Sequence, residues 1–236
     1  MTEPRSGEPF DGFADHYATR LDDPLRRKFA SDGDFFIRQK CHALVLEIRQ
    51  RLTQSRGSRL RLLDAGCGVG AAMRVLHPLF SIVGTDVSFP MLQHVMPGGC
   101  VAATEPFDLP FADHRFDVAF AFCVYHHIAP AERARHLREL GRVVRPGGLI
   151  SIFEHNPRNP VTRRIFERAE IDRGCEMIRA EELSRMFTDA GFTNVHCTYM
   201  LFVPELLAPW LGFIEPYLGW LPLGGQYFVS GTKAAA

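Results

Sequence analysis

Three glycines alternate with other residues directly after an apolar run, and this pattern constrains the fold more than any other feature of the chain. Residues 62–70 read LLDAGCGVG, so the run ends in Asp64 and the glycines follow it. Glycine tolerates positive φ and carries no Cβ, so a ligand can lie against the main chain while a helix begins close by. A second apolar run ends at Asp86, about twenty residues on, where nucleoside-binding units place an acid. The two runs predict a strand that leads into a ligand-binding turn.

Strand and helix patterns alternate through the middle of the chain. Apolar runs predict strands at 60–65, 81–86, 100–103, 116–122 and 148–153, with helices between them at about 70–78, 89–95 and 130–142. The tetrapeptide Arg145–Gly148 predicts a turn before the fifth strand. Parallel neighbours need crossover connections, so this alternation predicts an α/β protein with a doubly wound sheet and helices on both faces.

The flanking segments have patterns of their own. Before the alternating core, helical spacing predicts a short amphipathic helix from residue 10 and a longer helix from about 33 to 52. After it, a polar Arg-rich stretch at 158–173 precedes a helix at about 180–190, a strand at 193–202 and a final strand at 225–231. The length of 236 residues fits one domain.

Composition narrows the class of protein and of partner. Lys plus Arg and Asp plus Glu both total 27, so the formal net charge is zero. No overall electrostatic field therefore favours binding to nucleic acid or to an anionic membrane. The six cysteines have no C-x-x-C spacing, which argues against a zinc site and against a disulfide framework. No apolar signal region and no run of transmembrane length is present. We therefore expect a soluble cytoplasmic protein that binds neither a metal nor nucleic acid.

Polar residues follow the predicted strands at their carboxyl ends, where doubly wound sheets bind ligands. Asp86 can accept hydrogen bonds from the two hydroxyls of a ribose, and its alternative role is that of an acid at a helix N-terminus. Glu105 can address the amine of an adenine or be an ordinary exposed loop acid. Cys123–His127 and Glu154–Asn156 follow the fourth and fifth strands. We expect these groups to converge on one cleft.

These motifs together resemble the class I S-adenosylmethionine-dependent methyltransferases, and in particular the group that acts on small molecules. The resemblance rests on residues 62–70, 83–88, 105–118 and 137–148, which occur in the family's order. It implies a Rossmann-like, seven-stranded sheet, mostly parallel, whose last strand at 225–231 makes an antiparallel hairpin. It also implies S-adenosyl-L-methionine as the cofactor.

The resemblance also implies which residues hold the cofactor. The glycines line it, Asp64 orients its methionine part, and Asp86 holds its ribose. Tyr17 matches a tyrosine that closes over the carboxylate end in similar enzymes, although it could instead only anchor its helix. Arg38 could pair with the same carboxylate or be an ordinary solvated arginine. Here Glu-Pro stands where the family more often has Asp-Ala. The full predicted set is Tyr17, Arg38, Asp64, Gly66, Cys67, Gly68, Gly70, Asp86, Val87, Met91, Glu105, Pro106, Phe107 and Cys123.

Three histidines are candidates for catalysis. If the nucleophile is a hydroxyl, a histidine in reach can help to remove its proton. His155, in a run dense in hydrogen-bonding side chains, is the sharper candidate, whereas His126 and His127 fit cleft-shaping better. Asn156 and Asn159 either position an acceptor or shape turns before prolines. Three nearby arginines could bind an anionic substrate or could simply be solvated, namely Arg158, Arg163 and Arg164.

Residues 201–223 are apolar, with four prolines that exclude a membrane-spanning helix. The segment can form a wall for a hydrophobic acceptor, touch a membrane surface or a second subunit, or simply cover the core. We expect one methyltransferase domain, 1–236, in which 10–52 form a helical lid and 155–223 cover the acceptor side. Either a monomer or a homodimer fits this organisation.

The predicted function is methyl transfer from S-adenosyl-L-methionine to an oxygen or nitrogen of a small molecule, with a hydrophobic or lipid-like acceptor as one option. The alternative is a non-catalytic scaffold that binds the same cofactor. A nicotinamide dehydrogenase is disfavoured because its glycines follow a G-x-G-x-x-G spacing. Nucleic-acid methylation is disfavoured because residues 122–127 read FCVYHH, without the Asn/Asp-Pro-Pro-aromatic loop of those enzymes.

Overall fold

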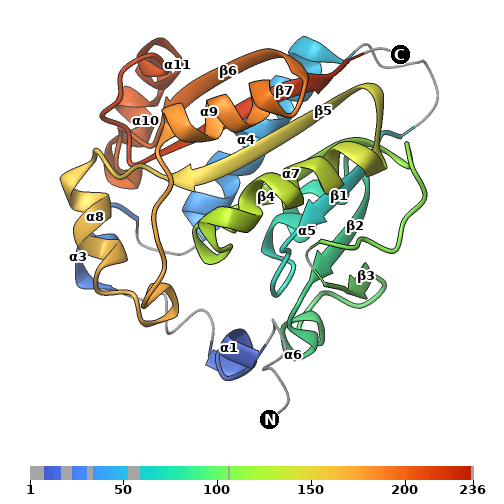
Figure 1. Cartoon of the computed structure of the whole chain (residues 1–236). Helices are drawn as coiled ribbons and strands as arrows, with labels where there is room; N and C mark the ends of the chain where they lie inside the picture. The colour runs from blue at the N-terminus through green and yellow to red at the C-terminus, as the bar shows by residue number, and fades with distance from the viewer. Residues whose placement is uncertain (1–7, 17–22, 31–33, 53–58, 106, 235–236) are drawn as a thin grey trace.

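The computed structural model describes residues 8–16, 23–30, 34–52, 59–105 and 107–234. Within these ranges seven strands form one sheet in the order β3-β2-β1-β4-β5-β7-β6 (Figure 1). The strands are β1 (Arg61–Ala65), β2 (Ser81–Asp86), β3 (Cys100–Ala103), β4 (Phe116–Phe122), β5 (Val144–His155), β6 (Phe192–Met200) and β7 (Gln226–Lys233). Strands β1 to β5 are parallel, and β7 runs antiparallel to both β5 and β6. The predicted fold class is confirmed.

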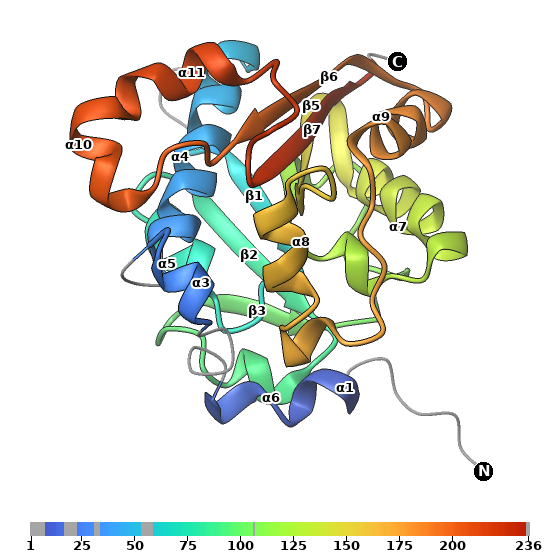
Figure 2. The same cartoon turned by 90° about the vertical axis from the view of Figure 1, so that its left-hand side faces the viewer.

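Helices cover both faces of the sheet. Helices α4 (Asp34–Arg51) and α5 (Ala71–Leu76) lie on one face, and α7 (Pro130–Val143) and α9 (Ala180–Asp189) lie on the other (Figure 2). The shorter helices are α1 (Glu8–Asp11), η1 (Ala14–His16), α3 (Pro24–Arg27), α6 (Phe89–Leu92), η2 (Tyr125–His127), α8 (Pro160–Phe166), η3 (Glu170–Asp172), η4 (Glu205–Leu207), α10 (Ala208–Leu211), η5 (Gly212–Ile214) and α11 (Glu215–Leu218).

Two apolar cores follow from strand alternation, because successive side chains of a strand point to opposite faces. Leu62 packs in the core beneath α4 and α5, whereas its neighbour Leu63 packs in the core beneath α7 and α9. In α4, Leu44 and Ile48 are fully buried in the first of these cores. Burial of each such side chain stabilises the fold by about 1.5–3 kcal/mol. Helix α4 is therefore part of the core, and the lid role of 10–52 stays a prediction.

The predicted turn at Arg145–Gly148 is wrong in detail, because these residues belong to the start of β5. The pairing of β5 with β4 begins at Val144 and shifts register between Phe116 and Val118, which marks a bulge. Gly147 takes a φ of 71°, and a Cβ on Gly148 would lie 2.8 Å from the Asp117 carbonyl oxygen. The Pro-Gly-Gly sequence thus bends a strand that continues through it.

The region after β5 is more helical than its sequence pattern predicted. Helix α8 begins after Asn159, whose Oδ1 accepts from the backbone N–H groups of Val161 and Thr162, both at 3.0 Å. Asparagine at the N-cap followed by proline is a start signal for a helix. Prolines at the starts of α10 and α11 likewise begin helices in the apolar segment. Among the described residues, no helix has both the length and the apolar character needed to cross a membrane.

Candidate functional site

A cleft of about 880 Å³ opens at the carboxyl ends of β1, β4 and β5. The cleft brings together eight of the residues predicted from the sequence, namely Asp64, Gly66, Cys67, Gly68, Cys123, His126, His127 and His155. Helices α3, α4 and α8 supply much of the remaining wall. The expected convergence of strand ends is therefore only partial, because Asp86 and Glu105, after β2 and β3, are not among the described residues that line this cleft.

The glycine turn after β1 requires glycine for two separate reasons. Gly66, Gly68 and Gly70 all have left-handed φ angles, of 80°, 51° and 73°. In addition, a Cβ on Gly66 would lie 2.5 Å from Cγ2 of Val124, which real atoms do not tolerate. The N–H groups of Gly66 and Cys67 both donate to the Thr85 carbonyl, at 2.7 and 2.9 Å. The turn is thus fixed by main-chain contacts with the end of β2.

Asp86 ties the same turn to the next helix. Its carboxylate accepts from the Gly68 N–H at 2.8 Å and from the Ser88 N–H at 2.9 Å. Burial raises the pKa of Asp86, although these N–H donors oppose the rise. A carboxylate has about four lone-pair sites, so each oxygen can still accept from a ligand hydroxyl. Asp86 is not among the residues that line the cleft as described, and its ribose role stays a prediction.

Asp64 presents a buried acceptor that has no hydrogen-bond partner among the described residues. It is 2% exposed and lines the cleft, and its Oδ2 is the unpaired atom. Burial and the nearby Asp86 carboxylate raise its pKa to about 8, whereas the Lys40 ammonium opposes the rise. Leaving a buried acceptor unpaired costs about 1–3 kcal/mol. The residues at this end of the cleft therefore fit a ligand that brings a cationic donor, such as an amino group.

Lys40 is a cleft residue that sequence analysis missed. It comes from α4 and is buried, with Nζ 3.5 Å from Sγ of Cys123 and 5.2 Å from the ring centre of Phe122. The available signal was its spacing, because it falls one turn after Phe36 and one turn before Leu44 on an otherwise apolar face. A lysine at such a position places a cation inside the cleft.

Cys123 marks the end of β4 with an unusual backbone conformation. Its φ is 57°, which is rare for a residue with a side chain and is found often at functional sites. Its N–H donates to the Phe153 carbonyl at 2.8 Å, and its Sγ lies 3.5 Å from both Lys40 Nζ and Gln226 Nε2. Cys123 therefore joins the glycine-turn end of the cleft to the histidine end.

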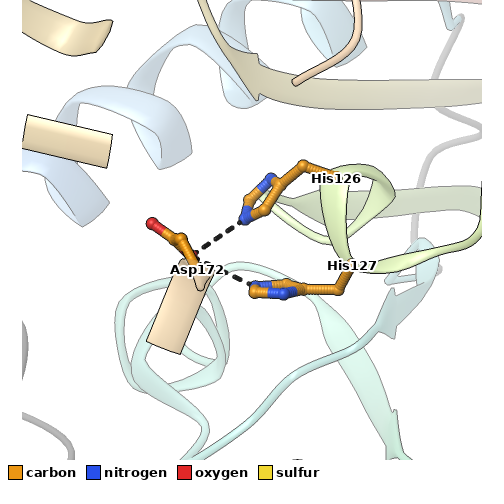
Figure 3. Close-up of side chains that lie close together, drawn as sticks. All are labelled: His126, His127 and Asp172. Atoms are coloured by element: carbon orange, nitrogen blue, oxygen red, sulfur yellow. Dashed lines mark ion pairs between the residues drawn. The ribbon is translucent and has the colours of Figure 1, made fainter. Parts of the chain in front are cut away.

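His126 lies between two buried carboxylates. Its Nδ1 donates to Oε2 of Glu154 at 2.7 Å, and its Nε2 lies 3.3 Å from Oδ1 of Asp172 (Figure 3). Oε1 of Glu154 in turn accepts from the Tyr125 N–H at 2.7 Å. Burial alone would lower the pKa of His126, but the two carboxylates raise it to about 10. A ring that holds its proton so strongly is a poor general base.

His127 and His155 are different, because both rings are neutral at pH 7. Burial, and then the charge on His126, lower the pKa of each to about 4. His127 points its Nε2 toward Oδ1 of Asp172 at 3.6 Å (Figure 3) and its Nδ1 toward Sγ of Cys175 at 3.1 Å. Nδ1 of His155 lies 3.4 Å from Nε2 of Gln226. These two rings can exchange hydrogen bonds with a neutral ligand.

The predicted arginines lie outside the cleft. Arg38 forms an exposed pair with Glu205 at 3.5 Å, and Arg158 pairs with Glu181 at 2.9 Å. Arg163 pairs weakly with Glu167 on its own helix, and Arg164 is exposed on α8. None of these arginines is among the residues that line the cleft as described, so their ligand-binding roles stay predictions.

The two asparagines after β5 have structural partners. Nδ2 of Asn156 donates to the Gly224 carbonyl at 2.8 Å, and its Oδ1 accepts from the Arg158 N–H at 3.0 Å. Nδ2 of Asn159 donates to the Leu223 carbonyl at 2.7 Å while its Oδ1 caps α8. These contacts agree with the turn-shaping interpretation and tie the apolar segment to the end of β5.

The remaining predicted cofactor residues lie beside the glycine turn or beyond it. Gly70 precedes α5 as its N-cap, and Val87 and Met91 flank the start of α6. Glu105 is exposed after β3, and Phe107 packs against the core with the Arg135 guanidinium 4.9 Å from its ring centre. Tyr17 and Pro106 lie outside the described residues. No contact tests the cofactor role of these residues, which stays a prediction.

The fold and the site together define a class of protein. A sheet of this strand order, with a glycine turn after its first strand and an acid at the end of its second, is typical of nucleoside-binding α/β domains. Residues 63–152 match the family model described as a methyltransferase domain. The chain belongs to the class I S-adenosylmethionine-dependent methyltransferase family, whose cofactor is S-adenosyl-L-methionine.

The names of the similar proteins refer to different methyl acceptors. "Probable tRNA methyltransferase 9B" of Homo sapiens is 30% identical over 142 residues, which are 59% of this chain and 31% of that protein. A 2-methyl-6-phytyl-1,4-hydroquinone methyltransferase of Synechocystis is 26% identical over 197 residues, 73% of this chain and 60% of that protein. The chain thus spans less than a third of the tRNA relative.

A solved structure of similar fold comes from Thermotoga maritima, where it is described as an S-adenosylmethionine-dependent methyltransferase. It matches with a TM-score of 0.69 at 20% identity and covers 97% of this chain and 99% of its own. At this identity the likeness concerns the fold alone, and it extends over nearly the whole chain.

Proposed function

We propose that the chain transfers the methyl group of S-adenosyl-L-methionine to an oxygen or nitrogen of a small apolar molecule. The observation that carries the proposal is the single cleft that joins the glycine turn and Asp64 to the three histidines. A methyl donor held at one end and an acceptor held at the other would share this space. Methyl transfer needs such a shared, water-poor space more than it needs a strong base.

The glycine-turn end supplies groups that suit the cofactor. When bound, S-adenosyl-L-methionine supplies an activated sulfonium methyl. The unpaired Oδ2 of Asp64 would accept from the amino group of its methionine part, and Lys40 would face the carboxylate of the same part. Asp86 would accept from the ribose hydroxyls while it holds the turn. Lys40 would thus take the role that was one of two options for Arg38.

The histidine end would position the acceptor. With Nε2 of Gln226 3.4 Å from Nδ1 of His155, the amide would donate to this nitrogen and the neutral ring would carry its hydrogen on Nε2. In this tautomer the ring orients an acceptor oxygen by donating to it. A half-turn of the Gln226 amide would reverse the tautomer and make Nε2 a proton acceptor. Gln226 is therefore the residue that would set whether His155 orients the acceptor or takes its proton.

An exposed apolar surface supports a hydrophobic or lipid-like acceptor. Between the cleft residues Leu201 and Gly225, the segment 205–223 leaves large side chains in solvent, including Trp210 at 67% and Trp220 at 76% exposed. The others are Leu206, Leu207, Leu211, Phe213, Tyr217 and Leu223. Surfaces of this kind mark interaction sites. We infer that the segment makes peripheral contact with a membrane. It would take an apolar acceptor from that membrane and deliver it to the cleft.

The free cysteines support a location for this activity. All six are unpaired, and five of them are partly or fully buried, which suits a reducing compartment. We therefore place the protein in the cytoplasm as part of the same proposal. Either a monomer or a homodimer is compatible with it.

Two measurements test the function in sequence. Calorimetry with S-adenosyl-L-methionine and its demethylated product should give binding of both, and binding of neither would overturn the proposal. Transfer of labelled methyl is then measured to long-chain phenols and quinols, to short polar amines and to tRNA. Transfer to the long-chain hydroxyls supports the proposal. Transfer only to tRNA would assign the activity named in the tRNA relative, and binding without any transfer would assign the scaffold alternative.

His155→Ala sharpens the test on the acceptor side. It should lower turnover at least tenfold while the affinity for S-adenosyl-L-methionine stays within twofold of that of the parent protein. His42→Ala, a change of an exposed histidine on α4, is the matched control and should leave both quantities unchanged. Equal losses of turnover and cofactor affinity in His155→Ala would indicate a structural role.

A further inference from the structure

Two histidines and one aspartate meet in a corner of the cleft, although they come from elements far apart in the chain. His126 and His127 lie on η2, and Asp172 ends η3. One ligand atom of each residue lies within 4.8 Å of the other two. In Figure 3 both rings point their edges at the same carboxylate, with Nε2 of His126 at 3.3 Å and Nε2 of His127 at 3.6 Å from Oδ1 of Asp172.

We propose that His126, His127 and Asp172 bind a divalent transition-metal ion of the zinc type. A tetrahedral ion with nitrogen and oxygen ligands at about 2.0–2.1 Å holds those ligand atoms about 3.3–3.4 Å apart. The two nitrogen atoms lie 3.3 and 3.6 Å from Oδ1 of Asp172, at or close to that value before any side chain moves. Two imidazoles and one carboxylate are also the donor set of catalytic zinc sites.

Glu154 lies where a residue that orients a metal-binding histidine is expected, on the far side of the His126 ring from Asp172. Glu154 is fully buried, accepts from Nδ1 of His126 at 2.7 Å and is itself held by the Tyr125 N–H. A histidine that binds a metal through one nitrogen almost always donates from the other, often to a carboxylate. Glu154 thereby fixes the rotation of the ring that points Nε2 at Asp172.

The charges of the cluster also suit a divalent cation. Glu154 and Asp172 bring two carboxylates into a region where both side chains and that of His126 are nearly inaccessible to water. Buried charges are stable only when they are paired or coordinate a metal. One divalent ion with two neutral imidazoles balances both carboxylates, whereas one imidazolium balances only one of them.

The position of the cluster gives the ion an open side. His126, His127 and Asp172 all line the cleft, and three protein ligands leave a fourth position of a tetrahedral ion for water or a ligand. This step rests on the proposed function: with the acceptor bound at the histidine end, the open position of the ion faces the acceptor. It would favour acceptors with a hydroxyl or carboxylate oxygen over acceptors with only an alkylated nitrogen.

The lack of C-x-x-C spacing in the sequence argues against a zinc site, but that argument concerns cysteine ligands alone. The ligands here are two adjacent histidines and an aspartate much later in the chain, and no spacing rule for metal sites covers that combination. Only the return of the chain through η3 brings Asp172 to the histidines.

The test is zinc uptake by the whole 236-residue chain after treatment with a chelator, followed by calorimetry with zinc chloride. The parent protein should bind one equivalent of Zn²⁺ per chain, and Asp172→Asn and His127→Ala should each bind it at least tenfold more weakly. Glu154→Gln, which changes only the outer partner, should weaken zinc binding 10–100-fold. His42→Ala is the matched control and should bind zinc like the parent.

Two results would overturn the metal site. One is the absence of stoichiometric zinc uptake by the parent protein, which would make the cluster an ion-pair network. The other is parent-like affinity in Asp172→Asn, which would place the zinc on thiols such as Cys123 and Cys175. Binding of the demethylated cofactor by each variant checks that it is folded. Zinc uptake is measured without cofactor or acceptor, so its failure leaves the methyl-transfer proposal standing.

Discussion

The two ends of the cleft are built from different kinds of contact. At the glycine-turn end, the Gly68 and Ser88 N–H groups hold Asp86, so the geometry depends on main-chain donors within one strand–helix–strand unit. At the histidine end, His126 is held by the side chains of Glu154 and Asp172, which come from distant segments. Main-chain contacts tolerate many side-chain changes, whereas a buried ion-pair network depends on every member. The histidine end should therefore be the more fragile of the two.

Glu154→Gln should have the largest effect and should separate the two ends. In the protein freed of metal, where His126 is an imidazolium, the change leaves this ring beside a neutral amide, and breaking a buried ion pair costs about 3–5 kcal/mol. We expect a loss of that size in the free energy of unfolding, measured by denaturant titration at pH 6, while cofactor affinity changes less than twofold. A comparable loss of cofactor affinity would show that the two ends are not independent.

The pH dependence of the same variant sharpens this result. The His126 charge holds the pKa of Glu154 at about 2, below its ordinary 4.5 and against the effect of burial, so its stabilisation is present above pH 4.5 and lost as the pH falls toward 2. The pKa of His126 is raised from 6.5 to about 10, so its stabilisation is present below 6.5 and lost as the pH rises toward 10. The stability gap between parent and Glu154→Gln should be widest between pH 4.5 and 6.5. A gap that does not depend on pH would contradict the ion pair.

Asp86→Ala tests the opposite end. Loss of the acceptor for Gly68 and Ser88, and for the ribose, should weaken cofactor binding by roughly 1–3 kcal/mol in calorimetry. Turnover at saturating cofactor should change little. Unchanged affinity would refute the ribose assignment, and Asp113→Ala, at an exposed acid paired with Arg142, serves as the control.

Asp64→Asn should improve stability while it impairs binding. Because the pKa of Asp64 is raised from 3.8 to about 8, its ionisation costs stability progressively as the pH rises through that range. The asparagine should therefore raise the free energy of unfolding of the cofactor-free protein by about 1–2 kcal/mol at pH 8, with a smaller gain at pH 6. Cofactor affinity should fall in the same variant. A loss of stability at pH 8 would mean that Lys40 already pairs with the carboxylate.

The smallest effect on stability is expected at the exposed aromatic residues. Trp210→Ala and Trp220→Ala should change the free energy of unfolding by less than about 0.5 kcal/mol, because both side chains are mostly in solvent. If the segment delivers apolar acceptors, the double variant should still raise the apparent KM for a long-chain phenol and weaken binding to lipid vesicles. Parent-like behaviour in both assays would remove the segment from substrate delivery.

The same contrast explains what the sequence could predict. The glycine turn and Asp86 are encoded by spacing within a short segment, so their placement follows from the pattern. Lys40, Asp172 and Gln226 reach the cleft only through the packing of α4, η3 and β7, and a single sequence carries no signal for such pairings. The bulge at Arg145–Gly148 was mistaken for a turn because Pro-Gly-Gly has the same composition in both settings.

The placement of β7 has a consequence for how the protein is made. β7 follows β6 in the chain but lies between β5 and β6 in the sheet, and it makes antiparallel pairs with both. A nascent chain that has emerged only as far as β6 therefore exposes the hydrogen-bonding edge of β5 along its apolar length. Such an edge is a template for pairing with another chain. The interval of synthesis between β6 and β7 is thus the stage at which this protein most needs protection from aggregation.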